Sequence, residues 1–208
     1  MDRLGVEKWL KSCNIKGYTI NEDLSVDVNG NVDLILRRLN EIPIRFRNVS
    51  GNFNCRANYL TTLFGCPTVV GGDFDCRSNE LVSLFGCPSS VVGYFNCGNN
   101  KLTSLVGCPI EIDGDFDCGE NKLSSLFGCP VRVSGFNCSY NELASLDGCP
   151  MIATDGFLVL INNNLNEQEG FLYEYTSEQI RLYYINKNLN EKLNGELEEV
   201  ATSKKKKI

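Results

Sequence analysis

Residues 72–92 read GDFDCRSNELVSLFGCPSSVV, and this stretch decides the fold because the chain repeats it. The shared pattern is F-x-C-x-x-N-x-L-x-x-L-x-G-C-P, followed by an apolar pair. Four copies begin at Phe53, Phe74, Phe95 and Phe116, spaced by 21 residues, and a fifth begins 20 residues later at Phe136. Self-similarity at such a short period is typical of proteins that stack one supersecondary unit on the next.

Weaker copies flank these five. Val32 lies 21 residues before Phe53, and residues 158–165 place Leu at both the Phe and the Cys positions. Terminal repeats cap a stack and are expected to be atypical. We therefore predict seven repeats over residues 31–165.

Each repeat predicts one turn of a solenoid. Phe74 and Cys76 are two residues apart, so both side chains point to the same side of a strand. The apolar side chains of one repeat cannot form a core alone, but they are buried when repeats stack as a parallel ladder about 4.8 Å apart. Gly-Cys-Pro marks a turn, and a 21-residue repeat leaves room only for a strand and an extended or 3₁₀ return. The prediction is a concave parallel β-sheet with a largely non-helical convex side.

An asparagine recurs three residues after the Cys position, for example Asn79 after Cys76. A buried Asn can both donate to and accept from backbone groups. We expect these side chains to satisfy the backbone of adjacent turns where each strand ends.

The cysteines allow three interpretations: a disulfide ladder, a thiolate metal site, or small apolar core residues. Of the 11 cysteines, Cys13 is expected to pack the N-terminal helix, and the rest form two columns. The columns are Cys55, Cys76, Cys97, Cys118 and Cys138, and Cys66, Cys87, Cys108, Cys129 and Cys149. Leu34 and Leu160 take the first column in the terminal repeats, and no C-x-x-C pair occurs. We favour core packing, which implies a reducing compartment and a cytoplasmic location.

Composition narrows the chemistry. The 208 residues carry a net charge of −6 and no His, which excludes Ser-His-Asp triads, Cys-His dyads and Cys₂His₂ zinc sites. No apolar run is long enough to span a membrane, and an acidic chain is a poor phosphate-backbone binder. The paired aspartates 73/75 and 115/117 are weak candidates for a calcium or glycosidase site. We expect no catalytic residue, cofactor or metal, and therefore not an enzyme.

The polar positions beside Phe and Cys predict a binding face. Residues 51–165 contain five basic and eleven acidic residues, a balance of −6, so a basic protein surface is the expected partner. An alternative stays open, namely that Asn and Asp simply solvate an exposed sheet. The candidate binding residues are Asn52, Asn54, Arg56, Asp73, Asp75, Arg77, Tyr94, Asn96, Asp115, Asp117 and Asn137.

The two ends predict caps. Residues 1–30 are expected to form a helix and a β-hairpin, residues 166–203 a helical segment capped at Ser177, and residues 204–208 a flexible basic tail. The last repeat exposes apolar Phe157, Val159 and Ile161 where other repeats are polar. We expect residues 171–200 to fold over them; an exposed recognition patch is the alternative.

With F-x-C in place of L-x-L, the pattern resembles the leucine-rich repeat. The short return is similar to that of bacterial type III effectors. The layout of Val6–Cys13, Tyr18–Asn21, Ser25–Leu34 and Val49–Cys55 resembles leucine-rich repeat proteins of tailed bacteriophages and some large DNA viruses. The resemblance implies an α/β solenoid with a short helix-and-hairpin cap, and a viral protein acting in the host cytoplasm.

These observations predict a non-enzymatic protein–protein interaction scaffold. The resemblance implies that it binds a host or defence-related protein, through the acidic face and through the C-terminal helix as a second possible surface. Three alternatives stay open: a structural virion component, the substrate-recognition module of an enzyme, and an acidic mimic of nucleic acid. We expect a monomer without nucleic-acid or membrane partners.

Overall fold

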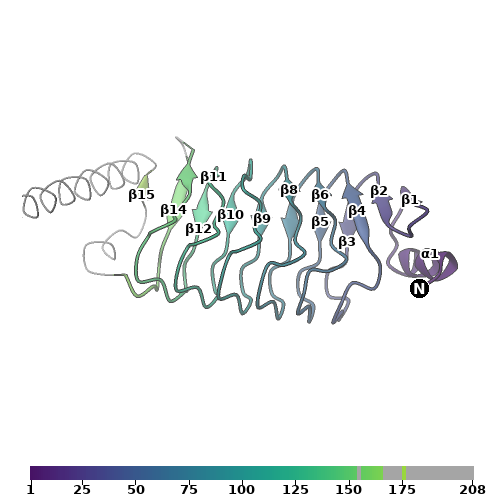
Figure 1. Cartoon of the computed structure of the whole chain (residues 1–208), viewed down its shortest axis with the longest axis horizontal. Coiled ribbons are helices and arrows are strands. Elements are labelled where there is room, and N and C mark those ends of the chain that lie inside the picture. The colour runs from purple at the N-terminus through teal and green to yellow at the C-terminus, as the bar shows by residue number, and fades with distance from the viewer. Residues whose placement is uncertain (154–155, 166–174, 177–208) are drawn as a thin grey trace, which may run out of the picture.

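The computed structural model describes residues 1–153, 156–165 and 175–176, which form a rod-like parallel β-solenoid (Figure 1). An α-helix, α1 (Arg3–Ser12), starts the rod, and every other element among these residues is a short strand. The strands are β1 (Tyr18–Ile20), β2 (Val26–Val28), β3 (Val32–Asp33), β4 (Phe46–Val49), β5 (Phe53–Asn54), β6 (Val69–Val70), β7 (Phe74–Asp75), β8 (Ser90–Val91), β9 (Phe95–Asn96), β10 (Phe116–Asp117), β11 (Arg132–Val133), β12 (Phe136–Asn137), β13 (Met151–Ile152), β14 (Phe157–Val159) and β15 (Tyr175–Thr176).

One eight-stranded sheet, here called the long sheet, runs the length of the rod in the order β15-β14-β12-β10-β9-β7-β5-β3. All its neighbours are parallel except β14 and β15, which are antiparallel. Phe53 pairs with Phe74, Phe74 with Phe95, and Phe95 with Phe116, so each phenylalanine faces its equivalent in the next coil. This register confirms the solenoid predicted from the 21-residue spacing.

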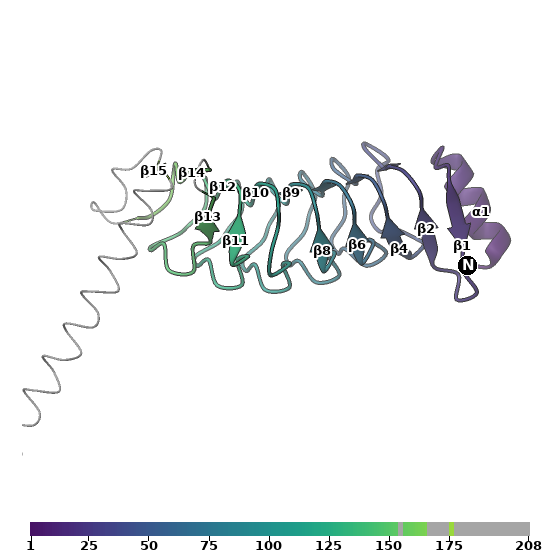
Figure 2. The ribbon, with the colours of Figure 1, turned by 90° about the horizontal axis from the view of Figure 1, so that it is seen from above.

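The return side of each coil is also non-helical in the described residues, as predicted, but it is more ordered than an irregular return. A second parallel ladder joins β2, β4, β6 and β8, and a two-stranded sheet joins β11 and β13 (Figure 2). Isolated bridges at Val91–Ile112 and Glu111–Arg132 lie between the two sheets. The segment after Gly-Cys-Pro therefore forms a second strand in these coils, with one apolar residue buried, as Val70 and Val91 are, and isolated bridges take its place at Glu111 and Ile112.

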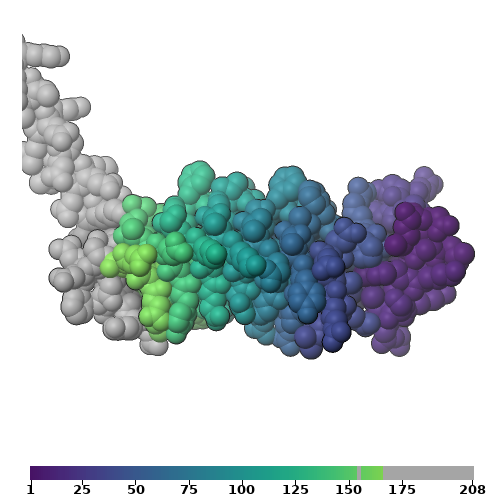
Figure 3. Space-filling model, turned by 90° about the horizontal axis from the view of Figure 1, so that it is seen from below, coloured from purple at the N-terminus to yellow at the C-terminus, as the bar shows by residue number. Residues whose placement is uncertain are grey.

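Stacked layers of identical residues fill the core. The phenylalanine rings of successive coils lie 5.0 to 5.9 Å apart between centroids from Phe53 to Phe136. The first-column cysteines and both leucines of each coil are also completely buried between Phe53 and Phe116. In the space-filling view, bands of colour follow one another along the rod, as expected when each coil packs on its neighbours in sequence (Figure 3).

The buried asparagines form the ladder that their spacing predicts. The amide nitrogen of Asn79 donates to the carbonyls of Cys55 and Cys76, both at 3.0 Å, and its oxygen accepts from the backbone N–H of Leu60 at 3.0 Å. Asn58, Asn100, Asn121 and Asn141 repeat the arrangement. Each asparagine thus links two adjacent coils and satisfies backbone groups at the end of a strand.

The glycine of each Gly-Cys-Pro has a steric reason. Gly65 has a φ of +92°, and a Cβ at this position would lie 2.6 Å from the carbonyl oxygen of Ile44 in the preceding coil. A side chain here would therefore be strained by the backbone conformation and would also clash with the neighbouring coil. Glycine therefore permits both the backbone conformation of this turn and the close approach of the preceding coil.

At the N-terminal end, α1 and the antiparallel β1–β2 hairpin occupy the region expected to hold a helix and a hairpin. The helix starts at Arg3, three residues before the expected Val6, because the Asp2 side chain caps it by accepting from the N–H of Gly5 at 2.8 Å. Trp9 packs on Phe46, which extends the phenylalanine stack, with ring centroids 6.3 Å apart.

At the other end, the expected C-terminal helix and basic tail lie outside the described residues. β15 pairs with the edge of β14, with Phe157 opposite Thr176 and Leu158 opposite Tyr175. Among the described residues, no helix has the length and apolar character needed to cross a membrane.

Candidate functional site

The long sheet turns one set of side chains inward and presents another outward. The outward set, here called the long-sheet face, consists of three columns. The first is Asn31, Asn52, Asp73, Tyr94, Asp115, Gly135 and Phe157; the second is Asp33, Asn54, Asp75, Asn96, Asp117, Asn137 and Val159; the third is Ile35, Arg56, Arg77, Gly98, Gly119, Ser139 and Ile161. All eleven candidate binding residues lie in these columns, because the strand register aligns equivalent positions.

The Asn and Asp side chains of the second column accept hydrogen bonds from the backbone at the end of each strand. The side-chain oxygen accepts from the backbone N–H two residues later: Asn54 from Arg56 at 3.2 Å, Asp75 from Arg77 at 3.1 Å, and Asp117 from Gly119 at 2.9 Å. Asn96 and Asn137 make the same bond. This is the Asx-turn geometry that Asn and Asp favour locally. The recurrence of Asn and Asp in this column is therefore explained by the ending of each strand, without a ligand.

The first column forms a ladder between coils as far as Tyr94. The side-chain oxygens of Asn52 and Asp73 accept from the backbone N–H of the next coil, at Asp73 (2.9 Å) and Tyr94 (3.0 Å). A tyrosine ring cannot reproduce this contact, and the ladder of carbonyl and carboxylate acceptors stops there. Side chains beyond Tyr94 in this column are released from that role.

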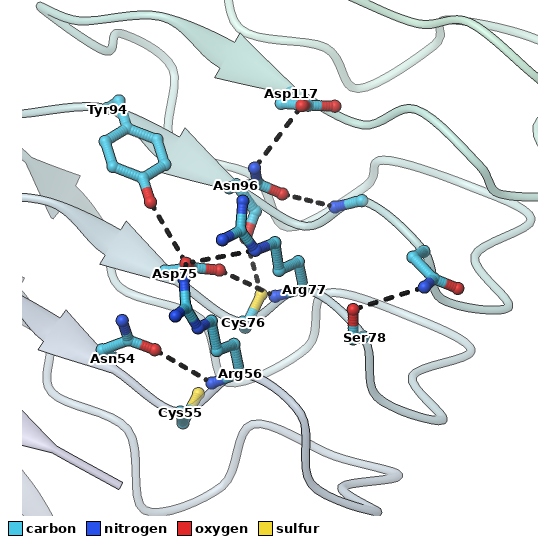
Figure 4. A network of polar contacts seen from close by, with 12 residues as sticks. Asn54, Cys55, Arg56, Asp75, Cys76, Arg77, Ser78, Tyr94, Asn96 and Asp117 are labelled. Atoms are coloured by element: carbon cyan, nitrogen blue, oxygen red, sulfur yellow. Dashed lines mark hydrogen bonds and ion pairs between the residues drawn. The ribbon is translucent and has the colours of Figure 1, made fainter. Parts of the chain in front are cut away.

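A cluster of charges surrounds Asp75 at the centre of the face (Figure 4). The Asp75 side chain is 3% exposed; Arg56 Nη1 lies 3.8 Å and Arg77 Nε 3.5 Å from its Oδ2. The hydroxyl of Tyr94 donates to the same oxygen at 3.1 Å. Burial, and then the negative charge of Asp75, raise the pKa of Tyr94 to about 12. Two arginines share the Asp75 carboxylate, and with Asp73 in the same coil the charges of Arg56, Arg77, Asp73 and Asp75 balance.

Two of the candidate binding residues therefore present little surface. Asp75 is 2% and Asn96 6% exposed, and both act as partners of their neighbours. Asn52 and Asp115 are exposed, and Asn54, Arg56, Asp73, Arg77, Tyr94, Asp117 and Asn137 are half-buried. The face is not uniformly acidic as the charge count suggests, because Arg56 and Arg77 balance Asp73 and Asp75 in the two coils before Tyr94.

On the other side of Tyr94, a pocket of about 270 Å³ opens between Tyr94 and Phe157; we call it the Tyr94–Phe157 pocket. Asp115, Asp117 and Asn137 contribute to its lining. Asp117 accepts from Gly119, Asn96 and Asn137, whereas the exposed Asp115 carboxylate has no hydrogen-bond or ion-pair partner among the described residues. Val159 also lines the pocket.

Phe157 lines this pocket, and the repeat pattern reveals it only in part. The sequence marks it as apolar in a polar column, with a cover expected from residues 171–200. Its side chain is 47% exposed and lies over Gly135, where a Cβ would be 2.4 Å from its Cε1. Within the expected cover, the structure describes only Tyr175–Thr176, which pairs along the edge of β14.

The cysteines pack in the core as expected. None of the eleven forms a disulfide, and the first cysteine column, Cys55 to Cys138, is buried throughout. Burial raises the pKa of Cys76, Cys97 and Cys118 well above the ordinary value. Over the described part of the chain, no group of three His, Cys, Asp or Glu side chains is arranged to hold a metal ion.

Neither a protein-family model, nor a curated protein, nor a solved structure matches this chain.

Proposed function

We propose that this chain is a non-enzymatic scaffold that binds a partner protein with its long-sheet face. One observation carries the proposal: the first column changes from Asn52 to Asp73, Tyr94 and Asp115, while the Phe, Cys and Leu layers beneath it stay constant. Stacked repeats provide an extended surface on which side chains can differ without changing the core. The fold supports such a surface, and partner recognition is what it would serve.

The resemblance to phage and large-virus leucine-rich repeat proteins extends the proposal. It suggests a viral protein in the cytoplasm of a bacterial host, where it binds a host or defence-related protein. This extension depends on the resemblance alone, because fold and function are separable.

Affinity capture from host lysate tests the proposal. The bait is the full chain, compared with a variant carrying Asp73→Lys and Asp115→Lys, which reverses two charges on the face. Asp75 and Asp117 stay unchanged because their carboxylates each hold several neighbouring groups. Asp73 accepts the N–H of Tyr94 at 3.0 Å, so thermal unfolding decides whether its reversal leaves the fold intact. The control carries Glu41→Lys and Glu142→Lys, which alter two exposed acidic residues outside the three columns.

We expect a partner that the wild-type chain and the control retain and that the face variant loses. Equal capture by the face variant and the control would contradict a role for the face. Thermal unfolding of the three proteins verifies that the charge reversals leave the fold intact.

A further inference from the structure

The Tyr94–Phe157 pocket differs from the rest of the long-sheet face because it contains an aspartate whose carboxylate makes no hydrogen bond or ion pair among the described residues. Asp33, Asp73, Asp75 and Asp117 each accept a backbone N–H, so their carboxylates help to build the solenoid. Asp115 occupies the same column as Asp73, but in the described chain its carboxylate accepts no hydrogen bond, and the ring of Phe157 lies over Gly135 in the next coil. Its charge is available to a ligand.

The walls of the pocket are aromatic. Tyr94 lies one coil before Asp115, and Phe157 leans over Gly135, the coil after Asp115. Tyr94 and Phe157 are three coils apart, and the Phe157 ring reaches back over Gly135 toward Asp115. The pocket volume of about 270 Å³ leaves room for a planar guanidinium or an ammonium group. Aromatic faces attract such cations.

The electrostatic surroundings favour a cation at this position. Asp115 and Asp117 line the pocket, and no basic residue of the described chain does. Arg56 and Arg77 lie on the far side of Tyr94, where they would repel a basic ligand group. The hydroxyl of Tyr94 points toward Asp75, so its ring is held in place as a wall between the two regions (Figure 4).

We propose that the Tyr94–Phe157 pocket receives a lysine or arginine side chain of the partner, with Asp115 as its principal counter-ion. This inference rests on the proposed function and specifies the chemistry that the long-sheet face recognises. A segment lying along the rod would place its basic residue here and direct any acidic residue toward Arg56 and Arg77.

A displayed library of random dodecapeptides, selected on the immobilised full chain, tests the assignment without knowledge of the natural partner. The enriched peptides are synthesised, and their affinities are measured by calorimetry for wild type, Asp115→Asn, Phe157→Ala and Asp113→Asn. Asp113→Asn is the matched control: it removes the same charge two residues away, from an exposed residue that does not line the pocket.

We expect enriched peptides to share a lysine or arginine whose replacement by alanine removes binding. Asp115→Asn should weaken binding about tenfold and Phe157→Ala about fivefold, whereas Asp113→Asn should change it less than about twofold. Enriched peptides without a basic residue, equal losses in Asp115→Asn and Asp113→Asn, or no enrichment at all would each overturn the assignment. Enriched peptides that lack a basic residue but bind the Asp73→Lys variant more weakly than the wild-type chain would still support the proposed function of the face.

Discussion

The hydroxyl of Tyr94 donates a 3.1 Å hydrogen bond to Oδ2 of Asp75, which belongs to the preceding coil. This bond joins the first and second columns of the long-sheet face, and it fixes the tyrosine ring between the arginine cluster and the Tyr94–Phe157 pocket. It also keeps the phenol protonated: burial and the Asp75 charge raise the Tyr94 pKa from 10.0 to about 12.

The pH dependence of stability should carry the signature of this tyrosine. Because its pKa is higher in the folded state than in the unfolded state, its contribution is complete below about pH 10 and is lost as the pH rises to about 12. Tyr94→Phe should remove this loss. Urea unfolding between pH 9 and about 12 measures it; identical pH profiles for wild type and Tyr94→Phe would contradict the assignment.

Phenylalanine in the core and phenylalanine at the turn should differ strongly in their effect on stability. Phe95→Ala removes a fully buried ring from the stack and should lower the free energy of unfolding by about 3–5 kcal/mol. Phe85 is 66% exposed, and Phe85→Ala should cost less than about 1 kcal/mol. Chemical denaturation of both variants makes the comparison, and similar losses would mean that the stack does not carry the core.

The asparagine ladder should contribute to the stability of the fold, as the apolar layers do. Asn79→Ala leaves the N–H of Leu60 and the carbonyls of Cys55 and Cys76 without their partner, which should destabilise the chain by about 2 kcal/mol or more. Asn40 is exposed, and its side chain makes no hydrogen bond among the described residues, so Asn40→Ala serves as the control. A thermal shift of equal size for the two variants would show that the ladder is dispensable.

The cysteines should be unreactive while the chain is folded. Burial raises the pKa of Cys76 and Cys97 well above 9.0, so almost no thiolate is present at pH 8. Iodoacetamide followed by peptide mass spectrometry should modify these residues only after unfolding in urea. Modification of Cys97 in the folded chain at a rate near that of a free thiol would contradict its place in the core.

Sequence spacing was sufficient to predict the features that repeat. The interval between Phe53 and Phe74 fixes which residues face each other across strands, and the recurrence of Asn79 three residues after Cys76 predicts its contacts with its own coil and the preceding one. Such contacts follow from the period alone, because every coil repeats the same geometry.

Features that depend on one coil, or on unusual backbone geometry, could not be predicted in this way. Asp75 and Asp115 look alike in the sequence, yet one is buried between arginines and the other is exposed and unpartnered in the described chain. Ala57, Ser78 and Glu120 adopt positive φ values of 55°, 56° and 54°, although none is a residue type that signals this conformation. The stacking of the coils imposes this positive φ, and the conformational preference of these residue types does not.

Photo-crosslinking in the lysate used for affinity capture tests the central claim, that the long-sheet face is the binding surface, most directly. A photoreactive amino acid is placed at Asn52 or Asp115 on the face, and at Phe127 or Ser83 on the return side of the coil. Phe127 is the informative control, because it is 75% exposed and belongs to a column of exposed apolar turn residues with Phe64 and Phe85. We predict a covalent adduct of one partner protein from Asn52 and Asp115 and none from Phe127 or Ser83; adducts that form only from the return side would contradict the account.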